Sequence, residues 1–218
     1  MELNLHPVEV RVLGALVEKE ITTPEYYPLS LNALVNACNQ KSNRDPVVSY
    51  DENEVDRALE SLRARGLALR STGSGSRVPK HAHRFSEQLN PDRRETAILC
   101  ELMLRGPQTV GELRTHAERM HPFDDTGEVE TVLERLIERT PDPLVMRLPR
   151  RQGEKEVRFT HLLSGPTAIA EPETQDVSPA PPSPRADRMA QLETEVVRLR
   201  DELESLKAQF AQFRRQFE

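Results

Sequence analysis

The stretch that decides the fold occurs twice, as DENEVDRALESLRARG at residues 51–66 and as DTGEVETVLERLIER at residues 125–139. In each copy an Asp lies three residues before a Glu, which predicts a capping box at the start of a helix. Apolar residues follow at helical spacing, namely Val55, Leu59 and Leu62 in the first copy and Val129, Leu133 and Leu136 in the second. A short apolar strand and an Arg-rich turn come next in both copies. We interpret this pattern as the third helix and the hairpin, or wing, of a winged helix.

Two further helices precede the third helix in each copy. In the first copy, Pro7 suits the first position of a helix, and Ser30 can cap a second helix. In the second copy, residues 96–104 carry the first helix and Thr109 caps the next one. The chain therefore contains one three-helix-plus-hairpin unit twice within residues 1–165, and this internal repeat is the main evidence for the fold.

The ends of the first wing can also be located. Gly66 is expected to terminate the third helix as its C′ residue. Residues 67–70 predict a strand, residues 72–76 a flexible hairpin tip, and a return strand is expected near His83–Phe85. The second wing has its predicted tip at residues 150–153.

The predicted fold class is α+β, mainly α, with two tandem winged-helix domains followed by a C-terminal coiled-coil helix. Residues 1–90 form the first winged-helix domain and residues 91–165 the second. Residues 166–186 are rich in Pro, Ala, Ser, Thr and acidic side chains, a composition that indicates a semi-extended linker. Residues 187–218 form the coiled-coil helix.

The coiled-coil prediction rests on apolar residues that alternate by three and four. They are Met189, Leu192, Val196, Leu199, Leu203, Leu206, Phe210, Phe213 and Phe217. Charges beside this seam attract in a parallel pair, as in Glu195–Arg200 and Glu202–Lys207. We therefore predict that the chain is its own partner in a parallel coiled coil, as a dimer or a trimer. The alternative is a helix that packs onto its own domains.

The composition limits the classes of function. The net charge of -6 argues against nonspecific coating of nucleic acid by the whole protein, although local patches could bind it. Cys38 and Cys100 fall within predicted helices, and we expect buried, reduced thiols. We find no signal peptide and no apolar run of about 20 residues that could cross a membrane, so a cytoplasmic location is expected.

Three longer runs carry a resemblance to a known family. They are EKEITTP at residues 18–24, YPLSLNAL at residues 27–34 and ACNQKSNRDPV at residues 37–47. The sequence closely resembles the YceH family of bacterial proteins over about residues 5–165. The resemblance implies a tandem winged-helix fold, often followed by a coiled-coil tail, and it implies no established biochemical activity.

The sequence offers little catalytic chemistry. We find no phosphate loop, nucleophile elbow or paired-Cys metal site. His81 and His83 would share one face of a strand, but they lack a nearby third metal ligand. Glu18 and Glu20 lie at a helix end and are interpreted as solvated charges. We therefore expect neither an enzyme nor a cofactor or metal site.

The basic residues of the first wing favour nucleic acid. No acidic residue occurs between Arg63 and Arg84, and the candidate phosphate contacts there are Arg70, Arg77, Lys80 and Arg84. The second wing is also basic, but Glu154 and Glu156 dilute it. The third helices oppose this interpretation because their first turns are acidic, which makes base readout by either helix doubtful.

The connection after the second helix is an additional candidate contact surface. Its amides and cations could bind phosphates and bases, and they are Asn39, Gln40, Lys41, Asn43 and Arg44. The alternative is that these side chains satisfy the backbone of the loop, as Asn often does. The sequence thus favours a DNA-binding regulatory protein that contacts DNA through this loop and the first wing. The rival is a protein–protein adaptor without direct DNA binding.

Overall fold

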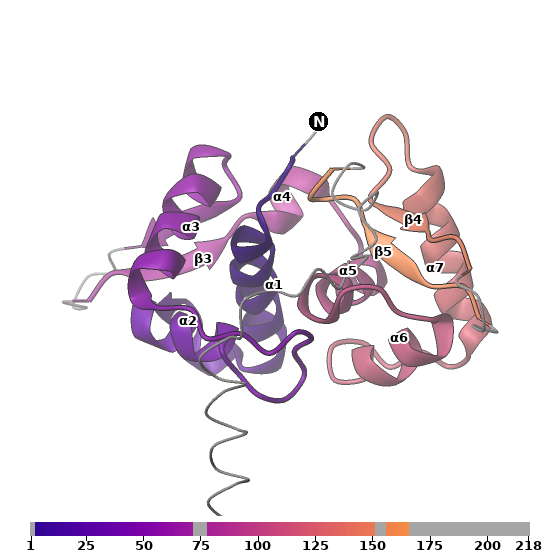
Figure 1. Ribbon diagram of the computed structural model, residues 1–218, viewed down its shortest axis with the longest axis horizontal. Coiled ribbons are helices and arrows are strands. Elements are labelled where there is room, and N and C mark those ends of the chain that lie inside the picture. Colours follow the sequence, from indigo (N-terminus) through magenta and orange to yellow (C-terminus); the bar gives the residue numbers. More distant parts are fainter. Residues whose placement is uncertain (1–2, 72–77, 151–155, 166–218) are drawn as a thin grey trace, which may run out of the picture. The chain divides into compact units, whose positions relative to one another are not determined.

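The computed structural model describes residues 3–71, 78–150 and 156–165 (Figure 1). These residues form a mixed α+β structure that is mainly helical, with two small antiparallel sheets, and this much of the predicted fold class is confirmed. They belong to one compact unit that covers residues 1–170. The predicted linker at residues 166–186 and the predicted coiled coil at residues 187–218 lie outside the described residues.

The first repeat contains three helices and a three-stranded sheet. Its helices are α1 (Pro7–Thr22), α2 (Leu31–Cys38) and α3 (Glu52–Ala64). A 3₁₀ turn, η1 (Pro24–Tyr26), and a short strand, β1 (Leu29–Ser30), connect α1 to α2. The hairpin consists of β2 (Ala68–Ser71) and β3 (Lys80–His83), and β3 lies between β1 and β2 with antiparallel pairing on both sides.

The second repeat follows the same order with fewer strands. Its helices are α5 (Arg93–Arg105), α6 (Val110–Ala117) and α7 (Thr126–Glu138), and its hairpin pairs β4 (Val145–Arg147) with β5 (Phe159–His161). A single bridge between Gln108 and Phe159 takes the place that the β1–β3 pairing has in the first repeat. A short helix, α4 (Phe85–Leu89), connects the two repeats.

The predicted caps of the third helices are present, with one difference. Asp51 accepts a hydrogen bond from the Glu54 amide and Glu54 accepts one from the Asp51 amide, which is the expected capping box. Asp125 likewise accepts from the Glu128 amide, but the Glu128 side chain bonds to the amide of Asp124. The second capping box is therefore only half formed, because the Glu128 carboxylate accepts from the amide of Asp124 and not from the amide of the cap residue, Asp125.

The C-terminal cap of α3 is confirmed in detail. Gly66 has a positive φ of 73°, a conformation that glycine adopts without the steric cost of a Cβ. The Gly66 amide donates to the Arg63 carbonyl and the Leu67 amide to the Leu62 carbonyl, at 2.9 and 2.8 Å. These two bonds form a Schellman motif, which turns the chain directly into β2.

The return strand of the first hairpin lies earlier than predicted. It ends at His83, and Phe85 begins α4 instead of ending the strand. Phe85 is fully buried, and its amide donates to Nδ1 of His83. An apolar residue after a strand is equally compatible with a strand or a buried helix start, and burial against the core decides for the helix here.

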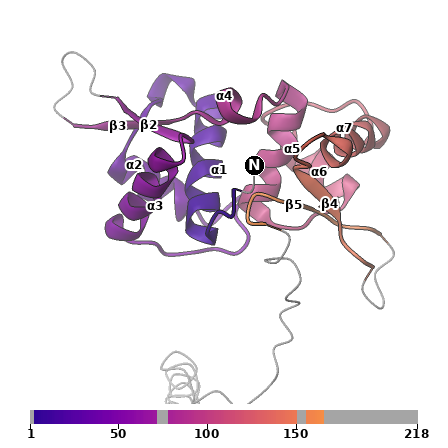
Figure 2. The same cartoon turned by 90° about the horizontal axis from the view of Figure 1, so that it is seen from above.

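The two repeats share one hydrophobic core, because their first helices pack against each other. Figure 2 shows α1 and α5 side by side, each with its own repeat on the far side. Gly14 allows the close approach: a Cβ at this position would lie 3.0 Å from Leu104 Cδ2 and from Met103 Cβ. The repeats are thus joined by a helix-to-helix contact as well as by α4.

The N-terminal segment also joins the two repeats. The Leu5 amide donates to the carbonyl of Leu163 at 2.8 Å, and both side chains are buried. Among the described helices, none combines the length and apolar composition that crossing a bilayer requires.

Candidate nucleic-acid interface

The hairpin of the first repeat carries the predicted phosphate contacts Arg70 and Lys80. Arg70 is exposed and Lys80 partly exposed. Arg70 pairs with His81 across the hairpin, whereas Lys80 pairs with Ser71. Because cross-strand partners share a face and neighbours along a strand alternate, Arg70 and Lys80 lie on opposite faces. The two cations therefore flank the hairpin instead of forming one flat patch, and Arg77 lies outside the described residues.

Arg84 lies at the other end of β3 from Lys80. Its guanidinium bonds to the carboxylate of Glu87 on α4, and both side chains are about half exposed. Four residues of extended chain span roughly 13 Å, so Arg84 is remote from the outer end of the hairpin. An exposed ion pair of this kind is weak and can be exchanged for a phosphate contact, but Arg84 does not extend the Arg70–Lys80 pair.

His81 adds no positive charge to this hairpin at neutral pH. It is almost fully buried, and its Nδ1 has no hydrogen-bond partner in the described part of the chain. Burial, together with the charges of Arg63 and Arg70, lowers the pKa of His81. Neither His81 nor His83 belongs to any group of three potential ligands that could hold a metal ion in the described residues.

The loop between α2 and α3 uses its Asn39 internally. The Asn39 side chain donates to the Tyr50 carbonyl and accepts from the Tyr50 amide, both at 2.8 Å. These two bonds close the loop between residues 39 and 50, and they engage both the amide nitrogen and the amide oxygen that a base edge would need. Asn39 therefore fixes the start of α3 and offers little to a nucleic acid.

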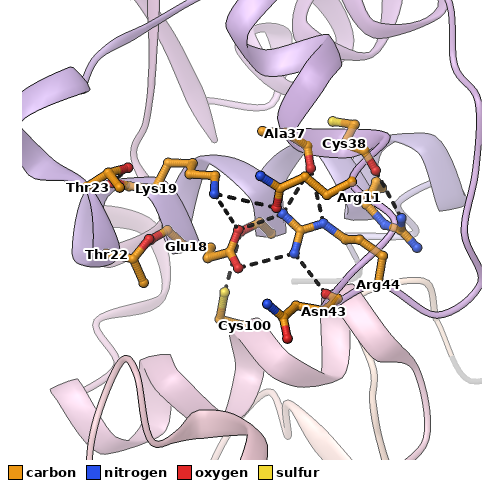
Figure 3. A network of polar contacts seen from close by, with 12 residues as sticks. Arg11, Glu18, Lys19, Thr22, Thr23, Ala37, Cys38, Asn43, Arg44 and Cys100 are labelled. Atoms are coloured by element: carbon orange, nitrogen blue, oxygen red, sulfur yellow. Dashed lines mark hydrogen bonds and ion pairs between the residues drawn. The ribbon is translucent and has the colours of Figure 1, made fainter.

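Asn43 and Arg44 also face the protein. Asn43 has a positive φ of 58°, and its Oδ1 accepts a hydrogen bond from Arg105 of the second repeat. The Arg44 side chain is fully buried and forms two hydrogen bonds to Glu18, of 2.6 and 3.2 Å. It also donates to the Ala37 carbonyl (Figure 3). The Arg44 guanidinium is thus enclosed within the protein and cannot reach a phosphate without leaving these partners.

Glu18 was predicted to be a solvated charge at a helix end, and this prediction is wrong. Its side chain is 0% exposed, and besides Arg44 it contacts Lys19 and the guanidinium of Arg119 from the second repeat. Burial alone would raise the pKa of Glu18, but the hydrogen bonds and charge of Arg44, with help from Lys19 and Arg119, outweigh it and hold the pKa below its usual value. Figure 3 shows Glu18 with Lys19 of the same helix and with Arg44 of the loop after α2.

Gln40 and Lys41 are the loop residues that remain near the surface. Gln40 accepts a hydrogen bond from Lys19 at 3.5 Å, a long and weak contact, and Lys41 is exposed. Of the five predicted loop contacts, the structure therefore leaves Gln40 and Lys41 accessible, and it places Asn39, Asn43 and Arg44 in internal hydrogen bonds.

The exposed faces of the two third helices carry acidic residues at equivalent positions. When Asp51 is aligned with Asp125, Asp56 and Glu60 of α3 correspond to Glu130 and Glu134 of α7. Glu60, Glu130 and Glu134 are exposed, and Asp56 is partly exposed. Residues four apart lie on one helical face, so each third helix presents an acidic stripe of two carboxylates, of which Glu60 also contacts Arg63 and Glu134 also contacts Arg147. Such a face is repelled by a phosphate backbone.

In the described part of the second hairpin, two of the cations contact acidic side chains. Arg147 lies over the Phe159 ring, 5.8 Å from its centre, and contacts Glu134 at 3.4 Å. Arg158 bonds to Glu112 through both terminal nitrogens, at 2.8 and 3.2 Å. These cations are therefore paired with acids of their own repeat.

Comparison with known proteins places the chain in a family. A family model described as "Protein of unknown function, DUF480" matches residues 5–154. The chain belongs to this family. Members named "UPF0502 protein" include one from Geotalea uraniireducens, 55% identical with full coverage of both chains, and one from Solibacter usitatus, 54% identical with full coverage of both. A third, from Geotalea daltonii, is 59% identical over 87% of this chain and 83% of its own.

Proposed function

We propose that this member of the family is a tandem winged-helix DNA-binding regulatory protein. In this proposal it holds the phosphate backbone with the hairpin of its first repeat and oligomerises through a coiled-coil tail. The observation that carries the proposal is the hairpin itself: residues 68–84 contain Arg70, Arg77, Lys80 and Arg84 and no acidic residue. Lysine and arginine side chains on an extended hairpin are suited to phosphate oxygens and gain affinity by releasing counterions.

The order of elements supports the winged-helix part of the proposal. Both repeats have three helices followed by an antiparallel hairpin, and in the first repeat a short strand before α2 adds to that hairpin. In winged helices the hairpin commonly contacts the DNA backbone or minor groove. Arg70 and Lys80 of the first hairpin have the charge for this role, whereas Arg84 is paired with Glu87, and Arg147 and Arg158 of the second repeat are also paired with acids.

The contact surface is narrower than the sequence suggests. It comprises the hairpin cations, with Lys41 and Gln40 of the loop as further candidates, and it excludes the enclosed Arg44. The acidic stripe on α3 opposes insertion of that helix into the major groove, because it would bring carboxylates close to phosphates. We therefore expect contacts to the backbone with little reading of base sequence.

Fluorescence anisotropy of the full chain with random and genomic duplexes, over a salt series, tests this proposal. We expect affinity to fall with salt at a log–log slope of about -0.9 for each phosphate contact. The double substitution Arg70→Gln with Lys80→Gln should weaken binding to all duplexes alike and flatten the slope by up to about two units. The matched control, Arg93→Gln with Arg114→Gln, removes the same charge from α5 and α6 and should have a much smaller effect. Absence of binding at low salt by the folded protein would overturn the proposal.

The acidic stripes favour a second candidate, a protein–protein adaptor without direct DNA binding. Equivalent acidic faces on α3 and α7 are suited to a basic protein surface, and repetition in both repeats argues for a shared use. A pulldown from native lysate, with and without nuclease, separates the two functions. Retention of one partner protein after nuclease treatment, and its loss on Glu130→Gln with Glu134→Gln, would support the adaptor. Recovery of proteins only when nucleic acid is intact would support DNA binding.

A further inference from the structure

Glu101 of α5 is an acidic side chain enclosed at the junction of the two repeats. Its side chain is 1% exposed, and Oε2 accepts a hydrogen bond from Arg105 Nε at 3.0 Å. Its other oxygen, Oε1, is buried and has no hydrogen-bond partner in the described part of the chain. An ionised carboxylate oxygen that is shielded from bulk solvent and accepts from no donor among the described residues is costly inside a protein. The enclosed position of Glu101 therefore favours the protonated form of its side chain.

The charged groups that act on Glu101 come from three parts of the junction. Arg105 belongs to the same helix, Glu18 to α1, and Arg119 to the segment after α6. Burial is the largest influence and raises the pKa of Glu101 to about 7; Arg105 opposes the rise, Glu18 adds to it, and Arg119 also opposes it. The attraction of Arg105 for the ionised form is thus present but is outweighed by burial.

Arg105 also connects Glu101 to the first repeat. Its Nη2 donates to Oδ1 of Asn43, in the loop between α2 and α3. Two residues later, the amide of Asp45 donates to the carbonyl of Leu104 at 3.0 Å. Residues 43–45 of the first repeat are therefore attached to the end of α5 through Arg105, the partner of Glu101, and through Leu104, which precedes Arg105 in the sequence.

We propose that Glu101 is a proton-controlled latch: residues 43–45 stay on α5 while Glu101 holds its proton, and they open when the proton is lost and water reaches Oε1. The direction follows from linkage. The closed form binds the proton of Glu101 more tightly than an open form in which the carboxyl is hydrated, so rising pH favours the open form. The fraction of the open form should rise with pH between the ordinary pKa of 4.5 and the folded pKa of about 7. Above pH 7 this fraction should level off.

Hydrogen exchange of the Asp45 amide in the full chain, between pH 5.5 and 8.5, tests the latch. After correction for the intrinsic pH dependence of exchange, opening at Asp45 should increase by roughly thirtyfold across this range, because the closed form retains the proton up to about pH 7. The increase should vanish in Glu101→Gln, which cannot ionise. The Leu67 amide, bonded to Leu62 within the first repeat, is the internal control and should show no such change.

A control variant and a direct titration of Glu101 complete the test. Glu60→Gln removes an exposed carboxylate on α3 and should leave the Asp45 response as in the natural protein. Titration of the Glu101 carboxyl carbon by NMR reports its ionisation directly, with an inflection near pH 7 expected. An inflection near 4.5, an Asp45 amide whose opening does not change with pH, or the same response in Glu101→Gln would each overturn the latch.

Discussion

Arg44 and Glu18 form a two-pronged ion pair inside the protein, with 2.6 Å between Nη2 and Oε2 and 3.2 Å between Nη1 and Oε1. Neither side chain is exposed, and Arg119 of the second repeat reaches Oε1 of the same carboxylate at 2.9 Å. The pair therefore connects α1, the loop after α2, and the second repeat. Its role in this structure is to hold these segments together.

Removal of one partner of this pair should be more harmful than removal of both. Arg44→Met leaves the Glu18 carboxylate buried with only Lys19 and Arg119, and should lower the free energy of unfolding by about 3 kcal/mol. The double variant, Arg44→Met with Glu18→Leu, should recover part of this loss because no buried charge is left unpaired. Urea unfolding of both variants measures the difference. A double variant less stable than the single one would contradict this account.

The same ion pair predicts loss of stability in acid. The pKa of Glu18 is below its ordinary value of 4.5 in the folded protein, so its contribution is present above pH 4.5 and is lost as the pH falls through the lower folded value. Glu18→Gln should therefore be less stable than the natural protein at pH 6, and the gap should narrow toward pH 3. Urea unfolding across this range checks it, and a constant gap would show that Glu18 does not titrate as described.

Substitution of Gly14 by Ala should destabilise the protein, whereas the same substitution of Gly111 should not. Gly14→Ala places a Cβ 3.0 Å from Leu104 Cδ2 and Met103 Cβ, and overpacking of this kind costs about 1–3 kcal/mol, more than the gain in helix propensity. Gly111 in α6 has open space, with no neighbouring atom within 4 Å of the position that a Cβ would take, so Gly111→Ala should be neutral or stabilise by up to about 1 kcal/mol. Thermal unfolding of the two variants compares them, and equal melting temperatures would contradict a tight α1–α5 contact.

The shared core predicts that both repeats unfold together. Leu59 of α3 and Leu133 of α7 are equivalent and fully buried, so each Leu→Ala change should cost about 2–5 kcal/mol. Because one cluster of buried residues spans both repeats, either change should shift a single cooperative transition. Calorimetry measures this. Two separate transitions, with only one of them displaced, would show that the repeats are independent domains.

The tail prediction is tested by assembly. We expect the full chain to be an oligomer at micromolar concentration and a chain ending at Gly165 to be a monomer, because the seam from Met189 to Phe217 is apolar at every third or fourth residue. Light scattering distinguishes these outcomes. A cysteine introduced at Met189 should oxidise to a link between identical positions only if the helices are parallel. A monomeric full chain would contradict the prediction.

Signals from residues close together in the sequence were sufficient to predict most of the helices and turns. The caps at Asp51, Ser30 and Thr109 and the turn at Gly66 depend on residues within a few positions, and all are present. β1 and α4 were not predicted. β1 has two residues and exists only because it pairs with β3, some 50 residues away, and α4 depends on burial of Phe85. Pairing over such distances leaves no periodicity to recognise.

The buried ion pair was missed for a related reason. Glu18 is followed by Lys19 and Glu20, so its neighbours in sequence resemble a solvated helix end. A signal was nonetheless present: residues 10–17 of α1 are apolar on more than one face, as expected for a helix covered on several sides. A buried acid on such a helix is usually paired with a cation, but Arg44 could be assigned as that cation only from the tertiary structure.

The hydrogen bond between Leu5 and Leu163 brings the beginning of the chain beside the point where it continues past Gly165. A label on the N-terminal segment near Leu5 would therefore lie beside Leu163, at the C-terminal end of the described repeats. Thr131, exposed on α7, is a better place for a label in measurements of assembly.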